Sequence, residues 1–209
     1  MLPIIQAAGW PIWPLIACSI LALALVIERL VSLRPRKVVP AGLLEETLAL
    51  SAQTPPSAEK IARIRAQGAL GEVLASGLAA RLAIPRCSDE ELRATMQSSG
   101  REVAHELERY LSALATIASA APLLGLLGTV IGMIEIFGAQ APATGATAGN
   151  PAQLAHGISV ALYNTAFGLI VAIPSLIFWR YFRARVDAYL LTLELAAERL
   201  ARHLGTQRS

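Results

Sequence analysis

Three long stretches of the chain are apolar and carry no charged side chain other than the titratable His156. They run from Ile4 to Ile27, from Leu111 to Ile134 and from Leu154 to Trp179. Each exceeds the roughly 18 to 20 residues with which a helix crosses about 30 Å of hydrocarbon. The pattern therefore predicts three transmembrane helices, with cores near Trp13–Val31, Ala115–Phe137 and Ala155–Trp179.

The segment between the first two stretches alternates polar and apolar positions. Pro55 and Pro56 break any helix at that point, so we expect a turn or short linker there. Residues 58–84 then have the pattern of one or two amphipathic helices. Ser88, followed three residues later by Glu91, predicts the start of a further helix with a capping box.

Two apolar stripes continue from the membrane stretches into polar sequence. The first approaches the second stretch with no breaker in between, at Leu92, Met96, Val103, Leu107, Tyr110 and Leu114. One helix from Ser88 to Phe137 would be roughly 75 Å long. The other leaves the third stretch, at Phe182, Val186, Tyr189, Leu193, Ala196 and Leu200. This spacing is typical of bundled helices, so we expect an all-α membrane protein whose second and third transmembrane helices extend into a helical bundle.

Basic residues flank the three stretches on one side only. They are Arg29, Arg34, Arg36, Lys37, Arg101, Arg109, Arg180, Arg183 and Arg185, whereas residues 1–9 and 138–153 carry no charge. The positive-inside rule then places the N-terminus outside and the C-terminus in the cytoplasm. The predicted parts are a first helix (1–33), a cytoplasmic region (34–112), a second helix (113–138), an outside loop (139–153), a third helix (154–179) and a cytoplasmic C-terminal helix (180–209).

Composition supports a membrane protein. Charged residues make up 16% of the chain and hydrophobic residues 55%, against roughly 25% charged in soluble domains. The mean hydropathy is +0.53. The net charge of +3 fits topology and lipid headgroups rather than nucleic acid, because no basic stripe alternates with aromatic residues.

The first stretch is interpreted as a retained helix. A cleaved signal peptide is the alternative, but such peptides begin with basic residues and the first 14 residues contain none. Trp10 and Trp13 instead suggest an interfacial anchor. Glu28 and Arg29 are expected to form an interfacial pair or to contact lipid.

The sequence offers little for catalysis or cofactor binding. We find no nucleophile with a base and no phosphate loop, since the glycine-rich run near Gly128 lacks the lysine of a Walker motif. Cys18 and Cys87 lie in different parts of the chain, and the histidines match no metal-ligand spacing. We therefore predict neither an enzyme nor a bound metal or cofactor.

Small residues gather on one face of the second and third stretches. On a helical wheel, Gly125, Gly128, Thr129 and Gly132 fall within an arc of about 100°, and Ala161, Thr165, Gly168, Ala172 and Ser175 share one face of the third stretch. One interpretation is close helix packing, to which Pro122 and Pro174 can also belong. The other is that both faces line a polar path, with Thr129 and Thr165 offering hydroxyls.

Two segments resemble a known family. The run Leu123–Gly132 (LLGLLGTVIG) and the run Gly157–Pro174 (GISVALYNTAFGLIVAIP) are similar to the ExbB/TolQ/MotA group of proton channels, and most similar to ExbB. The resemblance covers nearly the whole chain and its topology.

The resemblance implies a homopentamer in the bacterial inner membrane around a dimeric, single-span ExbD-like partner. Such proteins use the proton-motive force to drive TonB-dependent transport, so a TonB-like protein is a further implied partner. Thr129 and Thr165 would line the pore and face an aspartate of the partner. This fits a physical gap, because a threonine hydroxyl does not exchange protons at ordinary pH.

One position departs from the family pattern. Many relatives carry a glutamate five residues before the second threonine, where this chain has Val160. Glu135 could replace that carboxylate or simply reach water at the outer boundary, and Ser159 and Asn164 are further candidates for the pathway. TolQ-like envelope maintenance, a motility motor and a passive membrane scaffold remain alternatives.

Overall fold

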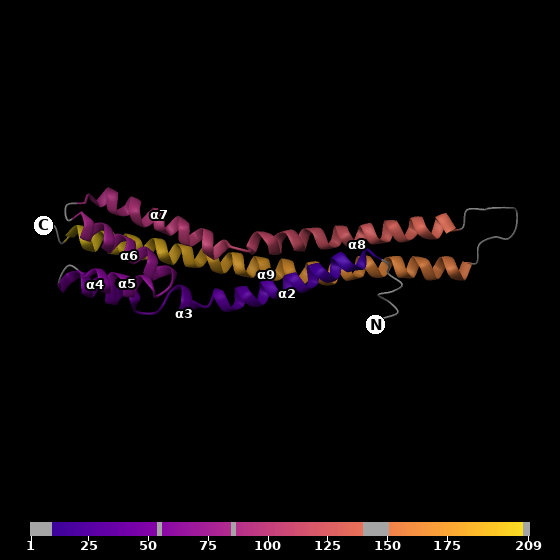
Figure 1. The fold of residues 1–209 in the computed structure, drawn as a ribbon, viewed down its shortest axis with the longest axis horizontal. Helices are drawn as coiled ribbons and strands as arrows, with labels where there is room; N and C mark the ends of the chain where they lie inside the picture. The colour runs from indigo at the N-terminus through magenta and orange to yellow at the C-terminus, as the bar shows by residue number, and fades with distance from the viewer. Residues whose placement is uncertain (1–9, 54–55, 85–86, 140–150, 207–209) are drawn as a thin grey trace. The chain divides into compact units, whose positions relative to one another are not determined.

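The computed structural model describes residues 10–53, 56–84, 87–139 and 151–206. Its helices are α2 (Ile12–Ser32), α3 (Pro35–Val38), α4 (Leu43–Gln53), α5 (Ala58–Arg65), α6 (Ala69–Ala83), α7 (Asp89–Glu108), α8 (Leu111–Ala139) and α9 (Pro151–Thr206) (Figure 1). The described residues contain no β-strand. The predicted all-α fold is therefore confirmed.

The chain divides into two compact units. One comprises residues 1–28 and 110–180, and the other residues 29–109 and 181–209. We call them the apolar unit and the polar unit. The apolar unit holds most of α2, all of α8 and the first part of α9, and the polar unit holds α3 to α7 and the rest of α9.

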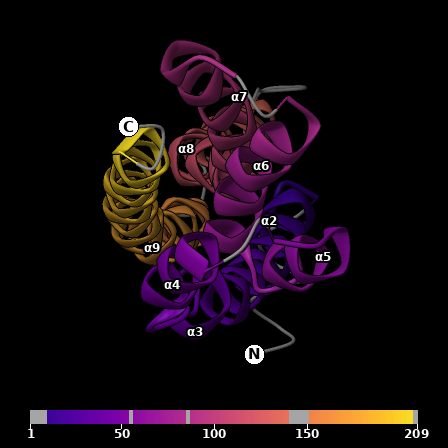
Figure 2. The same cartoon turned by 90° about the vertical axis from the view of Figure 1, so that its left-hand side faces the viewer.

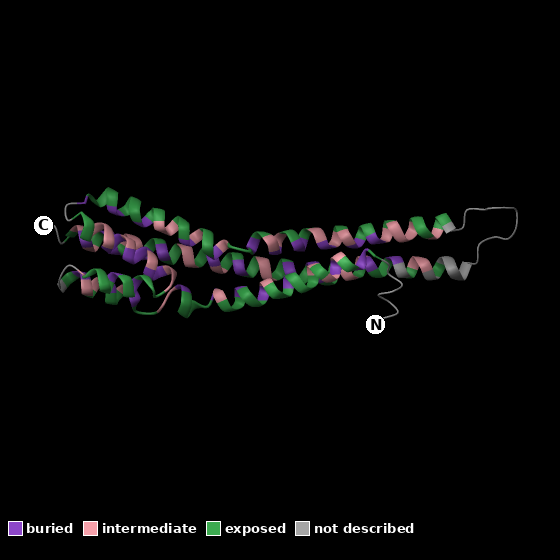
Figure 3. Ribbon diagram, in the orientation of Figure 1, coloured by how far each residue is buried: buried purple, intermediate pink, exposed green. Residues whose placement is uncertain are grey.

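The apolar unit contains helices long and apolar enough to cross a membrane. Three helical stretches that are apolar enough occur in the described chain, within Ile12–Ser32, Asp89–Gly138 and Gly157–Thr206, and in the second of them the apolar part is α8. Large apolar side chains are exposed on them, for example Ile20 and Ile134, each 66% exposed. Figure 3 shows many exposed positions, in green, along these helices. Such exposure is expected where lipid rather than water surrounds a helix. The chain is thus a multi-pass membrane protein.

In the polar unit, α6 lies between α5 and α7 (Figure 2). Most of its leucines and its valine are buried, as are Ile64 of α5, Met96 of α7 and Leu200 of α9. Gly77 permits a close approach here, since a Cβ on it would lie 2.6 Å from the Met96 sulfur. This core has the form of a small helical bundle.

Residues 58–84 form two helices, α5 and α6. Gly68 precedes α6 with φ +92°, a conformation that favours glycine, and its Cα faces the carbonyl oxygen of Lys37 at close range. The predicted capping box is confirmed. The Ser88 hydroxyl accepts from the Glu91 backbone N–H at 3.1 Å, and the Glu91 carboxylate accepts from the Ser88 N–H at 2.8 Å.

A continuous helix from Ser88 to Phe137 is not observed. Helix α7 ends at Glu108 and α8 begins at Leu111. Between them, Tyr110 has φ +66°, in the left-handed region that non-glycine residues seldom adopt. Its carbonyl oxygen accepts from the Leu114 N–H at 3.1 Å, which starts α8. The sequence shows no proline or glycine at this break, so the apolar periodicity passes through it unmarked.

The continuation of α9 beyond the third apolar stretch is confirmed, because the helix extends to Thr206. The predicted stripe is its buried side: Phe182, Val186 and Leu193 are 3% exposed or less, and Tyr189 is half-buried. The opposite side carries Leu191 and Leu195, which are 57% and 58% exposed. This part of α9 thus has one apolar side inside its own unit and a second one that the unit leaves open.

Candidate functional site

The small faces of α8 and α9 meet each other inside the apolar unit. A Cβ on Gly125 would lie 2.7 Å from the Asn164 carbonyl oxygen, and a Cβ on Gly168 would lie 2.6 Å from the Ala121 carbonyl oxygen. Real Cβ atoms do not approach other atoms so closely, so the two backbones touch only because both residues are glycine. We call this contact the glycine seam.

The other residues of the two small faces lie along this seam or beside it. Gly128, Ala161 and Ala172 are buried, and a Cβ on Gly132 would lie 3.3 Å from the Ala161 side chain. Pro122 is half-buried inside α8, and Pro174 is exposed inside α9. The seam therefore uses glycine and alanine.

Thr129 lies beside the seam and faces an open hollow. It is half-buried, and its hydroxyl donates to the Leu126 carbonyl oxygen on the same helix at 2.6 Å. With Val130, Met133 and Phe137 it lines a hollow of about 570 Å³ along α8. The hydroxyl oxygen keeps acceptor capacity after this donation, so it can solvate a group that enters the hollow.

Thr165 and Asn164 have different surroundings although they are neighbours in sequence. Thr165 is half-buried, whereas Asn164 is 2% exposed and lies against Gly125 and Gly128. The amide is thus placed in the seam between α8 and α9, and the hydroxyl at its edge.

The other pathway candidates lie on exposed positions. Glu135 is exposed on α8. Ser159 is exposed on α9, and its hydroxyl donates to the Ala155 carbonyl oxygen at 3.0 Å. The side chains of His156 and Val160, and the connection 140–150, lie outside the described part of the structure.

Arg29 has a role that the sequence does not predict. The sequence predicts an interfacial pair with Glu28 or a contact with lipid, whereas Arg29 is 4% exposed and its Nη1 donates to the Leu107 carbonyl oxygen at 3.1 Å. That carbonyl lies in the last turn of α7, where no backbone N–H of the helix can reach it. Arg29 therefore caps α7 just before the break between α7 and α8. The only feature of the sequence that could have indicated this role is that an arginine stands at the end of an apolar run.

A second arginine caps α2. Arg185 donates from Nη1 to the Tyr181 hydroxyl at 2.8 Å and from Nη2 to the Tyr189 hydroxyl at 2.6 Å. The Tyr189 hydroxyl in turn donates to the Leu33 carbonyl oxygen, directly after α2, at 2.9 Å. The hydrogen bond to Tyr189, followed by that to Tyr181, raises the pKa of Arg185 above its ordinary value because both stabilise the charged guanidinium.

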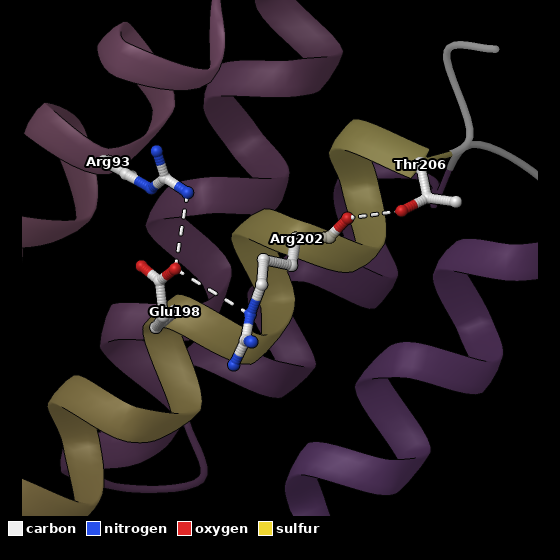
Figure 4. Close-up of polar contacts among 4 residues, drawn as sticks. All are labelled: Arg93, Glu198, Arg202 and Thr206. Atoms are coloured by element: carbon white, nitrogen blue, oxygen red, sulfur yellow. Dashed lines mark hydrogen bonds and ion pairs between the residues drawn. The ribbon is translucent and has the colours of Figure 1, made fainter.

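A groove opens between α7 and α9 on the polar unit. Its volume is about 730 Å³, and Leu191 and Leu195 belong to its lining. Arg93 on α7 pairs with Glu198 on α9 across it at 3.3 Å, and Arg202 approaches the same carboxylate at 3.8 Å (Figure 4). The groove thus combines an apolar floor with charges of both signs.

Comparison with known proteins gives a family match over residues 65–195, to the model described as the MotA/TolQ/ExbB proton channel family. This range includes α8, the glycine seam and both threonines.

Individual relatives span most of the chain. The biopolymer transport protein exbB1 of Vibrio cholerae is 37% identical over 172 residues, which are 81% of this chain and 73% of that protein. An ExbB-like biopolymer transport protein of Synechocystis is 32% identical over 86% of this chain and 83% of its own length. The Tol-Pal system protein TolQ of Haemophilus influenzae is 39% identical over 97 residues, or 46% of this chain and 41% of that protein.

Proposed function

Because this chain belongs to the MotA/TolQ/ExbB proton channel family, we propose that it is the channel subunit of an inner-membrane motor that uses the proton-motive force for TonB-dependent transport. The name ExbB recurs among its relatives, which supports the TonB assignment, and TolQ proteins are among them as well. Envelope maintenance of the TolQ kind is the second candidate for that reason.

The position of Thr129 carries this proposal. The glycine seam closes one side of α8, and Thr129 beside it lines the open hollow. A hydroxyl at the edge of an apolar hollow can solvate a carboxylate that enters from a partner helix, but it cannot itself carry protons. We propose that Thr129 and Thr165 line the proton path and that a single-span, ExbD-like partner supplies the missing aspartate.

Replacing each threonine by valine tests this pathway. Valine keeps the side-chain shape and removes the hydroxyl, so packing should survive. Proton-driven uptake of a TonB-dependent substrate should fall by about tenfold or more, and a tenfold change corresponds to about 1.4 kcal/mol. Thr116→Val is the matched control, because Thr116 is exposed on the same helix and donates to the Ser112 carbonyl oxygen at 2.9 Å. Full uptake by both Thr129→Val and Thr165→Val, with normal assembly, would assign these residues to packing.

The energised process can be decided by complementation. The chain and a single-span, ExbD-like protein from the same organism would be expressed together in cells lacking either the TonB-linked motor or the Tol motor. We expect restored uptake of a TonB-dependent substrate in the first strain. Restored detergent resistance in the second strain alone would favour envelope maintenance, and activity in neither strain would leave a scaffold or motility role.

We also propose a homopentamer. The extended stripe of α9 is used inside its own unit, so the exposed side with Leu191 and Leu195 is the better candidate for contact between copies. The groove that these leucines line supports this, because its arginines and glutamates can pair with their counterparts on a second copy. Native mass spectrometry in detergent should give a pentamer, and a predominantly monomeric or dimeric species would contradict it.

We further propose that the N-terminus is outside and the polar unit cytoplasmic, as the arginine distribution favours. Single cysteines on a Cys18→Ala, Cys87→Ala background can be labelled with an impermeant maleimide in intact cells. A cysteine replacing Lys60 should react only after permeabilisation. Labelling before permeabilisation would reverse the orientation.

A further inference from the structure

Asn164 is a polar side chain enclosed by the apolar unit. It is 2% exposed and lies in a stretch of α9 that carries no charged residue. A buried amide in such surroundings is costly unless its position is well defined, because misplaced polar groups lose their hydrogen bonds. Its burial therefore calls for a structural reason.

Helix α8 provides a space that fits this side chain. A Cβ on Gly128 would lie 2.9 Å from the Cβ, Cγ and Nδ2 atoms of Asn164, so any larger residue would collide with the amide. One turn earlier, a Cβ on Gly125 would meet the Asn164 carbonyl oxygen at 2.7 Å and Cα of Thr165 at 3.0 Å. The two glycines form a notch that holds both the side chain and the backbone of Asn164.

The notch has consequences for the two half-buried threonines. Thr165 follows Asn164, and Thr129 follows Gly128, so each hydroxyl lies about 100° around its helix from a residue fixed in the seam. While Asn164 stays in the notch, the two helices cannot rotate about their own axes relative to each other, so the two hydroxyls keep their directions. The contact between Asn164 and Gly128 thus determines which way both threonines face.

We propose that Asn164 is a positioning residue, whose side chain in the Gly125–Gly128 notch sets the rotation of α8 against α9 and thereby the direction of Thr129 and Thr165. The proposal rests on the proton-path function proposed for these threonines. Asn164 itself stays inside the seam and does not contact the transported proton. Its effect on transport passes through the orientation of its neighbours.

A size-exchange experiment tests this. Gly128→Ala fills the notch, and the double variant Gly128→Ala, Asn164→Gly returns the space by removing the side chain that collides. Gly138→Ala is the matched control, because Gly138 lies on the same helix and a Cβ there meets nothing within 4 Å. All variants carry Thr165→Cys on the Cys18→Ala, Cys87→Ala background.

The readout is the rate at which a small water-soluble maleimide labels position 165 in folded protein purified in detergent. We expect Gly128→Ala to change this rate by roughly fivefold or more, since overpacking of a tight contact shifts local equilibria at least that far. The double variant should return it to within about twofold of the parent, and Gly138→Ala should leave it unchanged. A lower yield of folded protein with an unchanged labelling rate would mean that the contact only stabilises the fold, and would overturn the proposal.

If Gly128→Ala does not fold, Asn164→Ala replaces it, because this variant empties the notch without a collision. The labelling rate should again change, and an unchanged rate overturns the proposal. The measurement involves no transport, so it can fail while the threonine-to-valine tests succeed, or succeed while they fail. The positioning role and the proton-path function are therefore tested separately.

Discussion

The two units hold their helices together in different ways. In the apolar unit, hydroxyls bond to carbonyl oxygens of their own helix, as Thr129 does to Leu126 and Ser175 to Val171, and α8 meets α9 through glycines. In the polar unit, side chains reach between helices, as Arg29 does to Leu107 and Tyr189 to Leu33. Close backbone packing thus dominates the apolar unit, whereas in the polar unit side-chain caps add to the apolar core.

This difference follows from the surroundings of each unit. Lipid is as apolar as leucine, so helices in a membrane gain little from burying leucine against leucine and more from close backbone contact. A helix end in water or in a polar interior has carbonyl oxygens without partners, and a guanidinium can satisfy them with charge-assisted hydrogen bonds. Substitutions in either unit can therefore test this difference.

The largest effect is expected from Arg29→Met. The substitution keeps a long side chain and removes the cap of α7, so it should lower the free energy of unfolding by about 3 kcal/mol, the upper end for hydrogen bonds to charged groups. Thermal unfolding of the purified protein in detergent measures this. Arg199→Met, at an exposed position of α9, should change stability little, and equal effects of the two variants would show that Arg29 acts through charge alone.

Gly125→Ala should come next, with a loss of about 2 kcal/mol. Its Cβ would collide with the backbone of Asn164 and Thr165, which cannot move as a flexible side chain can. Gly138→Ala again serves as control, and the midpoint of thermal unfolding is the measurement. If both alanines are tolerated equally, the seam is looser than the structure indicates.

Tyr189→Phe should lower the free energy of unfolding by about 1 kcal/mol, because it removes one hydroxyl from the cap of α2. Tyr163→Phe, at an exposed position of α9, is the control. Because the pKa of Arg185 is raised, the stabilisation that its charge gives the folded protein is complete below the ordinary arginine pKa and is lost only as the pH rises above that value. The effect of Tyr189→Phe should therefore be the same at about pH 6 and about pH 9, and a difference between them would implicate another titrating group.

The smallest effect on stability is expected at the break between α7 and α8, where the sign of the change is informative. Asparagine adopts the left-handed conformation more readily than tyrosine, so Tyr110→Asn should be neutral or stabilise the protein by about 0.5 kcal/mol. In an uninterrupted helix the same substitution would bring no gain, because asparagine and tyrosine have similar helix propensities. Denaturant titration measures the sign, and a clear loss of stability would contradict the left-handed conformation at Tyr110.

The sequence by itself determined the three apolar helices, the capping box at Ser88 and the extension of α9, because each depends on residues close together in the chain. Length, periodicity and cap chemistry are local properties, and they are visible without knowing what a helix contacts. The family also followed from local runs around Thr129 and Thr165.

The tertiary structure alone decided what covers each face. The wheel showed small faces on α8 and α9 but not that they cover each other, and it could not separate Asn164 in the seam from Thr165 at its edge. The helical periodicity also gave no sign of the break at Tyr110. It gave no sign of the cap on the Leu107 carbonyl oxygen either, because the capping residue, Arg29, is 78 residues away from Leu107 in the chain. A periodic pattern specifies which side of a helix is apolar, whereas the partner of that side is chosen by long-range packing.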